Sequence, residues 1–171
     1  MSGTILPYKG VLPTIHATAF IAPSAVVIGD TEIGEDSGIW FGCVVRGDVN
    51  VIRIGKRTNI QDGTIIHVAS RGQGTFIGDD ITIGHMAVLH ACTLEDRCFI
   101  GMKACVMDGA YVESDAMVAA GALVTPGKRV RRGQLWAGNP ARHLRDLTPE
   151  EIAFFPESAR HYVGLGRTYR G

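Results

Sequence analysis

The chain has 171 residues and carries 17 basic and 17 acidic side chains. This balance argues against the broad basic surface of a nucleic-acid-binding protein. The first residues, MSGTILPYKG, lack a signal-peptide layout, and no apolar run approaches the ~20 residues that cross a membrane. The four cysteines form no C-x-x-C pair, so a zinc ribbon is not indicated and a reducing, cytoplasmic location is expected.

After a lead-in over residues 1–20, the segment 21–127 shows a six-residue repeat. Aliphatic residues recur at every sixth position over most of it, with examples at Ile21, Val27, Ile33, Ile39, Val45, Ile54, Ile60, Ile66, Ile77, Ile83, Leu89, Ile100, Val106, Val112, Val118 and Val124. A residue that is nearly always small follows four positions later. Amphipathic helices do not repeat at six, whereas a coil of short flat strands does. The repeat therefore predicts an all-β parallel β-helix with three strands in each triangular turn.

The repeat is interrupted at three places. Three extra residues lie between Val45 and Ile54, and about five lie between Ile66 and Ile77, where VASRGQGT is expected to form an exposed loop. One residue is missing shortly after Leu89. These changes alter the length of individual turns and leave the coil intact.

The last part of the chain no longer follows the repeat. Residues 128–147 are interpreted as an irregular exit, followed by a helix over 148–165. Thr148 at the N-cap and Glu151 at N3 form the sequence signature of a capping box. Pro156 is expected to kink or split this helix. The helix is predicted to pack along the coil.

Indexing the coil assigns each histidine to a face. Faces 1, 2 and 3 carry Ile54, Ile60 and Ile66 in one turn, and Ile77, Ile83 and Leu89 in the next. His67 and His90 directly follow the two residues of face 3, so they are predicted to stack about 4.8 Å apart. Arg46 belongs to the same column, one turn earlier. Two stacked imidazoles of this kind can bind one metal ion.

His85 falls on face 2, around a corner from this pair, with Asp62 one turn below it. It therefore cannot serve the same site within one chain. A homotrimer of triangular prisms would bring face 2 of one chain against face 3 of the next, giving three shared sites. Three imidazoles with an open fourth position are typical of catalytic zinc.

The other candidate ligands receive no metal role. The remaining histidines stand alone and are expected to be ordinary polar residues: His16, His143 and His161. Two cysteines fall in the small-residue series and are expected to pack at corners: Cys43 and Cys98. No role is assigned to Cys92 or Cys105.

Four motifs together resemble the gamma-class carbonic anhydrase family over nearly the full length: RGD at 46–48, NIQD at 59–62, His67 and HMAVLH at 85–90. The resemblance implies a left-handed β-helix and a homotrimer. It also implies Zn²⁺, with Fe²⁺ or Co²⁺ as alternatives, held by His67 and His90 of one subunit and His85 of the next.

The resemblance also implies roles for neighbouring residues. Arg46 and Asp62 would pair across the subunit interface, as a clamp or in substrate steering, while Asp48 and Asn59 support the local network. Gln61 would orient the hydroxide or the product. The implied reaction is attack of a metal-bound hydroxide on carbon dioxide, which gives bicarbonate.

The chain departs from the family at two positions that serve proton transfer. Val49 and Ser70 stand where active members carry glutamates. Tyr162 is the candidate replacement, with His161 beside it. Three alternatives therefore stay open: a metal-dependent hydrolase acting on acyl-CoA thioesters, a non-catalytic metal-binding scaffold, and a hexapeptide acyltransferase without metal. No partner in a membrane or among nucleic acids is expected.

Overall fold

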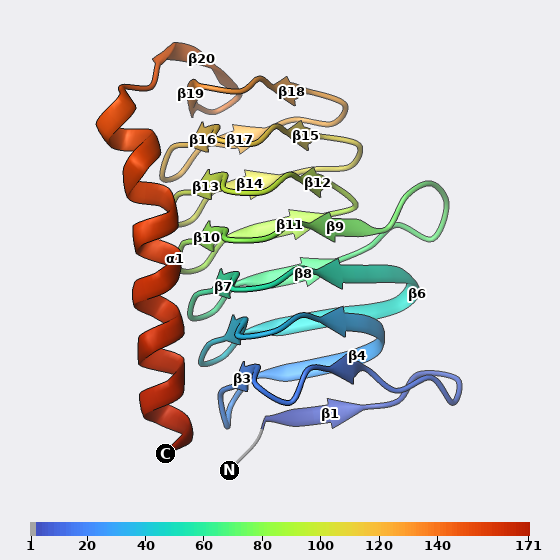
Figure 1. Cartoon of the computed structure of the whole chain (residues 1–171). Coiled ribbons are helices and arrows are strands. Elements are labelled where there is room, and N and C mark those ends of the chain that lie inside the picture. Colours follow the sequence, from blue (N-terminus) through green and yellow to red (C-terminus); the bar gives the residue numbers. More distant parts are fainter. Residues whose placement is uncertain (1–2) are drawn as a thin grey trace.

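A computed structural model of the chain describes residues 3–171 and shows a left-handed parallel β-helix of about seven turns, with one helix along its side (Figure 1). The predicted fold class is therefore confirmed. Face 1 is formed by β2 (Thr14–Ile15), the second halves of β4 (Val26–Ile33) and β6 (Val44–Ile54), β9 (Thr75–Ile77), β12 (Thr93–Leu94), β15 (Tyr111–Val112) and β18 (Arg129–Val130).

The other two faces continue each turn. Face 2 contains β3 (Phe20–Ile21), β5 (Gly38–Ile39), β7 (Asn59–Ile60), β10 (Thr82–Ile83), β13 (Phe99–Ile100), β16 (Met117–Val118) and β19 (Gln134–Gly138). Face 3 contains β1 (Thr4–Leu6), the first halves of β4 and β6, β8 (Ile65–His67), β11 (Val88–His90), β14 (Cys105–Val106) and β17 (Leu123–Val124). The extra residues before Ile54 extend β6 around the corner between faces 3 and 1.

The interior of the coil is filled by the aliphatic series. Ile39, Ile60 and Ile83 stack in register on face 2, and each is fully buried. The small series lines the corners, where Cys43 and Cys98 are buried as predicted. Burial raises the pKa of the Cys43 thiol to about 11, which makes it a packing residue rather than a nucleophile at neutral pH. Hydrophobic burial along a continuous one-dimensional core thus stabilises the fold.

Both ends of the coil extend further than the repeat predicts. β1 and β2 lie within the lead-in 1–20 and pair in parallel with β4. At the other end, Val130 and Trp136 continue the six-residue step and pair in register with Val112 and Val118. The surrounding charged residues of KRVRRGQLW hide this step in the sequence. The coil then ends with an antiparallel hairpin of β19 and β20 (Ala141–Asp146), so the segment 128–147 is mostly regular.

Helix α1 (Pro149–Arg170) runs beside face 2 and returns toward the start of the coil (Figure 1). The predicted capping box is present, because Thr148 accepts from the Glu151 N–H and the Glu151 carboxylate accepts from the Thr148 N–H. The helix continues through Pro156 as one element and ends five residues beyond the predicted boundary. Its packing against the sheet outweighs the local cost of the proline.

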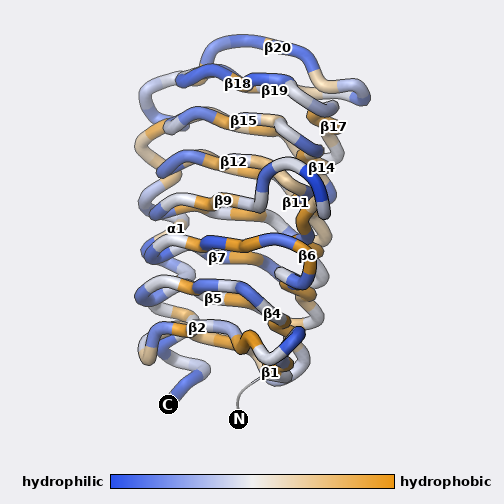
Figure 2. The backbone as a smooth tube through the Cα atoms, turned by 90° about the vertical axis from the view of Figure 1, so that its right-hand side faces the viewer, coloured by the Kyte–Doolittle hydropathy of each residue, from blue (hydrophilic) through white to orange (hydrophobic). Residues whose placement is uncertain are grey.

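The loop between β8 and β9 projects from the coil as expected (Figures 1 and 2). Asn50 secures it by donating to the Ala69 carbonyl, and Thr75 donates to the His67 carbonyl at 2.6 Å. The loop is therefore tied to the strand that carries His67. No helix of residues 3–171 is long and apolar enough to cross a membrane.

Candidate metal centre in two halves

The predicted histidine stack is present on face 3. His67 ends β8 and His90 ends β11, and the two residues pair directly in the parallel register. Their rings lie with Nδ1 of His67 3.2 Å from Nε2 of His90. Backbone register thus sets the ring separation, since each histidine follows a fully buried residue, Ile66 or Leu89, that fixes its strand.

Each ring of the pair contacts a carboxylate through its other nitrogen. Nε2 of His67 lies 3.0 Å from Oδ1 of Asp48, and Nδ1 of His90 lies 2.6 Å from Oδ1 of Asp108. Such carboxylate partners fix the ring orientation and the tautomer of metal-binding histidines. Such contacts favour the proton on each outer nitrogen, which would leave the two inner nitrogens as electron-pair donors.

Arg46 lies at the lower end of this column and contacts Asp48 in the same chain. Burial alone would raise the pKa of Asp48, but hydrogen bonds from His67 and Arg46 outweigh it and hold that pKa below its ordinary value. Asp48 is thus an anion that faces both a cation and an imidazole. The predicted pairing of Arg46 with Asp62 involves two chains and stays a prediction.

His85 lies on the other side of a corner, two residues after the end of β10 on face 2. Met86 makes this corner with a left-handed φ of 59°, so the chain turns sharply between His85 and His90. Nδ1 of His85 lies 2.8 Å from Oδ2 of Asp62, one turn below as predicted. The His85 side chain is 38% exposed, and no hydrogen bond to Nε2 is formed within residues 3–171. Its Nε2 is therefore available to a neighbouring molecule.

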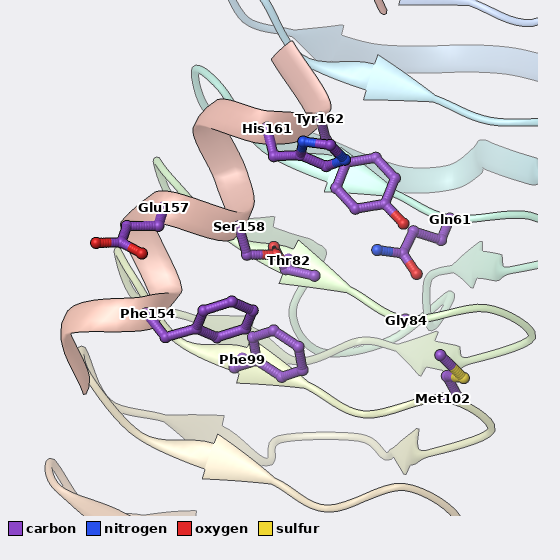
Figure 3. Close-up of a pocket in the computed structure, with 10 residues that line it drawn as sticks. All are labelled: Gln61, Thr82, Gly84, Phe99, Met102, Phe154, Glu157, Ser158, His161 and Tyr162. Atoms are coloured by element: carbon purple, nitrogen blue, oxygen red, sulfur yellow. Dashed lines mark hydrogen bonds between the residues drawn. The ribbon is translucent and has the colours of Figure 1, made fainter. Parts of the chain in front are cut away.

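Gln61 and Tyr162 meet in a cleft next to this single histidine (Figure 3). The cleft has a volume of about 490 Å³ and lies between α1 and face 2, with Gly84, Phe99 and Phe154 among its walls. The Tyr162 hydroxyl points toward the Gln61 side chain (Figure 3). Burial and the negative charge of Asp62 raise the pKa of Tyr162, so its hydroxyl stays protonated at neutral pH.

The side chain of Gln61 is only 4% exposed and has a defined orientation. Its Nε2 donates to Oδ1 of Asn59 at 3.0 Å, which leaves Oε1 as the free acceptor. Asn59, also predicted as a supporting residue, is buried and donates in turn to Thr82. Asn59 and Gln61 of the NIQD motif therefore form a fixed polar pair, of which Gln61 lines the cleft.

Within one chain, two of the three predicted ligands are close enough together to bind the same divalent ion. Two nitrogen ligands of tetrahedral zinc, each about 2.05 Å from the ion, lie about 3.3 Å apart. The 3.2 Å between the inner nitrogens of His67 and His90 matches this spacing. Within residues 3–171, no group of three or more side chains is placed to hold a metal ion. The pair supplies two ligands, and His85 faces away from it on another side of the prism.

Sequence reasoning missed Asp108 and the contact between Thr82 and Ser158. Leu89 pairs in register with Val106, so Asp108 lies close to His90 on the next turn, and the repeat was a usable signal. Ser158 contacts Thr82 at 2.9 Å from helix α1, 76 residues away, and no local pattern predicts that contact.

The other singled-out residues lie apart from this arrangement or change its character. His16 and His143 contact only nearby exposed partners, whereas His161 lines the same cleft as Tyr162. Val49, at a position where the resemblance implied a proton-transfer glutamate, is 44% exposed and supplies no acid. Cys92, which had no assigned role, is fully buried, and burial raises its pKa to about 12.

Several named proteins are similar in sequence to this chain over most of its length. Protein YrdA of Escherichia coli (strain K12) is 43% identical over 169 residues, which cover 95% of this chain and 92% of that protein. The carbonic anhydrase of Geobacillus kaustophilus is 41% identical over 97% of this chain and 91% of its own. Three gamma carbonic anhydrases of Arabidopsis thaliana are 49% to 54% identical over 92% of this chain. This chain belongs to the gamma carbonic anhydrase family. The predicted family is therefore confirmed, although no protein-family model matches the chain.

Longer plant members are also similar. Gamma carbonic anhydrase 1, mitochondrial, of Arabidopsis thaliana is 54% identical over 92% of this chain. The chain spans about three fifths of the length of the plant relatives it matches.

Solved structures show the same fold. A hexapeptide transferase family protein from Anaplasma phagocytophilum superposes with a TM-score of 0.94 at 49% identity, over 97% of this chain and 98% of that one. A Bacillus cereus protein named for a proposed acetyltransferase activity gives 0.96 at 37% identity, over 99% and 98% of the two chains. Gamma carbonic anhydrases and transferases thus share this architecture, and the side chains of the site must distinguish them.

Proposed function

We propose that this member of the gamma carbonic anhydrase family is a metal-dependent enzyme that hydrates carbon dioxide reversibly at sites shared between chains. The observation that carries the proposal is the division of the histidines into two halves. His67 and His90 lie as a ready pair on face 3, and His85 lies outward on face 2. In a homotrimer, each of the three subunit interfaces brings the face 3 half of one chain against the face 2 half of the next.

Exposed aliphatic side chains beside the pair support an interface on face 3. Ile65 and Val88 are each 39% exposed and stand in register next to His67 and His90. An apolar strip on a solenoid face favours contact with another protein surface. A second copy of the chain, bringing face 2 and His85, is the occupant that completes the metal site.

The donor set suits Zn²⁺ best, with Fe²⁺ or Co²⁺ as alternatives, because all three ligands are imidazoles. Relatives named as carbonic anhydrases support a metal in general. When bound by three neutral ligands, the ion lowers the pKa of water toward about 7 and supplies a hydroxide nucleophile. Asp48, Asp108 and Asp62 orient the rings that hold it.

The remaining residues act on the substrate side. Gln61 presents Oε1, which accepts a hydrogen bond from the nucleophile or from the hydroxyl of bicarbonate. Tyr162 donates from its protonated hydroxyl toward the same space. Arg46 and Asp62 form the clamp between subunits. Since Val49 and Ser70 replace the family's glutamates, proton export relies on buffer or on water in the cleft.

A second candidate is hydrolysis of an acyl ester or thioester at the same site. The cleft volume of about 490 Å³ exceeds what carbon dioxide requires, and its walls are largely apolar. Turnover of acyl-CoA thioesters faster than of carbon dioxide would favour this candidate. The two structural relatives named for transferases raise a third possibility, which a metal content near one per chain would oppose.

The test combines metal analysis of anaerobically purified protein with a stopped-flow hydration assay. We expect about one metal ion per chain, and hydration that falls to the buffer rate after chelation or in His90→Ala. His143→Ala, which removes an exposed histidine remote from the site, serves as the control and should keep both properties. Metal-loaded protein with no activity above buffer would end the proposal. Cytoplasmic location stays a prediction, because the plant relatives are named as mitochondrial.

A further inference from the structure

A chain of buried hydrogen bonds connects Gln61 to helix α1. Gln61 Nε2 donates to Asn59 Oδ1 at 3.0 Å, Asn59 Nδ2 donates to Thr82 Oγ1 at 3.0 Å, and Thr82 Oγ1 lies 2.9 Å from Ser158 Oγ. All four residues are at most 8% exposed. Three of them lie on or beside neighbouring strands β7 and β10, and only Ser158 comes from the helix.

The chain fixes which end of each carboxamide faces the cleft. Asn59 Nδ2 donates to both the Ile81 carbonyl and Thr82 Oγ1, so both of its hydrogens are used. Asn59 Oδ1 is then left as an acceptor and requires the amide end of Gln61. Consequently Gln61 must turn Oε1, not Nε2, into the cleft.

Ser158 removes the remaining ambiguity at Thr82. A hydroxyl has one hydrogen, and Thr82 can give it either to Ser158 or to a reversed Asn59 carboxamide. With Ser158 in place, Thr82 has a separate partner at 2.9 Å and accepts from Asn59. Without Ser158, the Thr82 hydrogen is left without this partner and competes to donate to Asn59, whose orientation is then held by the Ile81 carbonyl alone.

We propose that Ser158 and Thr82 are positioning residues, through which helix α1 sets the orientation of the Gln61 carboxamide in the cleft. The chemical meaning of that orientation rests on the function proposed above, because Gln61 Oε1 is the acceptor for the nucleophile or product. The orientation itself does not depend on that function. The C-terminal helix is thus part of the site and not only a cover for face 2.

The direct test observes Gln61 in the full-length, ¹⁵N-labelled protein by NMR. The side-chain amide signal is assigned by its loss in Gln61→Glu. In Ser158→Ala and in the near-isosteric Thr82→Val, we expect this signal to shift and its hydrogens to exchange faster with solvent. Ser158→Thr keeps the hydroxyl and should restore the original signal. Thr168→Ala removes a hydroxyl that bonds only within the same helix, and it should have no effect.

Hydration kinetics supply the second readout. Ser158→Ala should lower kcat by about threefold to tenfold, with KM and metal content unchanged, as expected for loss of one hydrogen bond that acts through another residue. Rescue by Ser158→Thr separates this effect from general damage to the helix.

The outcomes separate the two proposals. A Gln61 signal that is unchanged in both Ser158→Ala and Thr82→Val overturns the positioning role. A signal that responds in a protein with no hydration activity retains the positioning role and rejects the proposed function. Equal loss of kcat in Ser158→Ala and Ser158→Thr also counts against the hydroxyl as the cause.

Discussion

The two halves of the candidate metal centre are built differently. The face 3 half consists of His67 and His90, whose separation is set by parallel strand register and whose rings are held by Asp48 and Asp108. The face 2 half offers a single, partly exposed His85 at a corner. A regular solenoid can therefore stack two ligands within one chain, but it directs a third ligand around the corner away from them.

The halves also differ in what accompanies the histidines. The face 3 half carries charged groups, Arg46 and two carboxylates. The face 2 half has one carboxylate, Asp62 beside His85, and the neutral groups Gln61 and Tyr162, which line the cleft between face 2 and helix α1. The two faces thus contribute different groups to the proposed site: two ligands come from face 3, and the third ligand and the groups proposed to orient the substrate come from face 2. In the proposed trimer they meet only when two subunits assemble.

Among substitutions confined to one half of the candidate metal centre, the largest expected effect is a loss of metal affinity. Asp108→Asn should weaken metal binding about 10-fold to 100-fold, because His90 loses the carboxylate that orients its ring. Competition with a chelator of known affinity measures this change.

The matched control is Asp146→Asn, which alters a histidine–carboxylate contact with His143 on the surface. Its metal affinity should equal that of the unmodified protein. If Asp108→Asn also keeps the full metal affinity, the Asp108 carboxylate does not orient His90 for metal binding. The claim that the face 3 half is preorganised would then be wrong.

A smaller effect is expected from the face 2 half. Tyr162→Phe should lower kcat about fivefold, the cost of one hydrogen bond, with metal content unchanged. Since burial and Asp62 raise the pKa of Tyr162, its hydroxyl stays protonated below its ordinary pKa of 10, and the kcat–pH profile between about 6 and 9 should keep its shape.

Imidazole buffer distinguishes this role from proton transfer. A hydrogen-bond donor is not replaced by buffer, so the defect of Tyr162→Phe should persist at high imidazole. Full recovery of kcat in imidazole would instead identify Tyr162 as the proton carrier that replaces the missing glutamates.

The smallest effect concerns the attachment of helix α1. Hydrogen bonds from Arg145 and from the Thr148 N–H lower the pKa of Glu151 from 4.5 to about 2. A depressed folded-state pKa stabilises the fold above about pH 4.5, and this stabilisation is lost as pH falls toward 2. Glu151→Gln should therefore lower Tm slightly at pH 6 and by less near pH 2.

Thermal unfolding followed by circular dichroism measures this difference. Glu157→Gln changes a carboxyl of the same helix outside the capping box and is the control. If Glu151→Gln instead changes Tm by the same amount at pH 6 and at pH 2, that result would contradict a stabilising role of the ionised Glu151 carboxylate.

The sequence predicted the fold and the histidine stack because both follow from the six-residue period. His67, His90 and the Asp62–His85 contact lie where the indexing puts them, since one residue of slip would reverse each side chain. The period failed at the ends of the coil, where Val130 and Trp136 stand among charged residues. It also could not predict Ser158, because the docking of a helix on a distant turn leaves no local pattern.

The shared site is tested most directly by mixing two inactive variants. His90→Ala keeps His85, and His85→Ala keeps the pair; neither homotrimer has a complete site. Mixed trimers, purified through two different affinity tags, join an intact pair to an intact His85 at one interface in each ring, and should recover about one third of the metal and hydration activity of the unmodified protein. Mixed trimers that bind no more metal than either parent would show that the histidines of neighbouring chains do not act together.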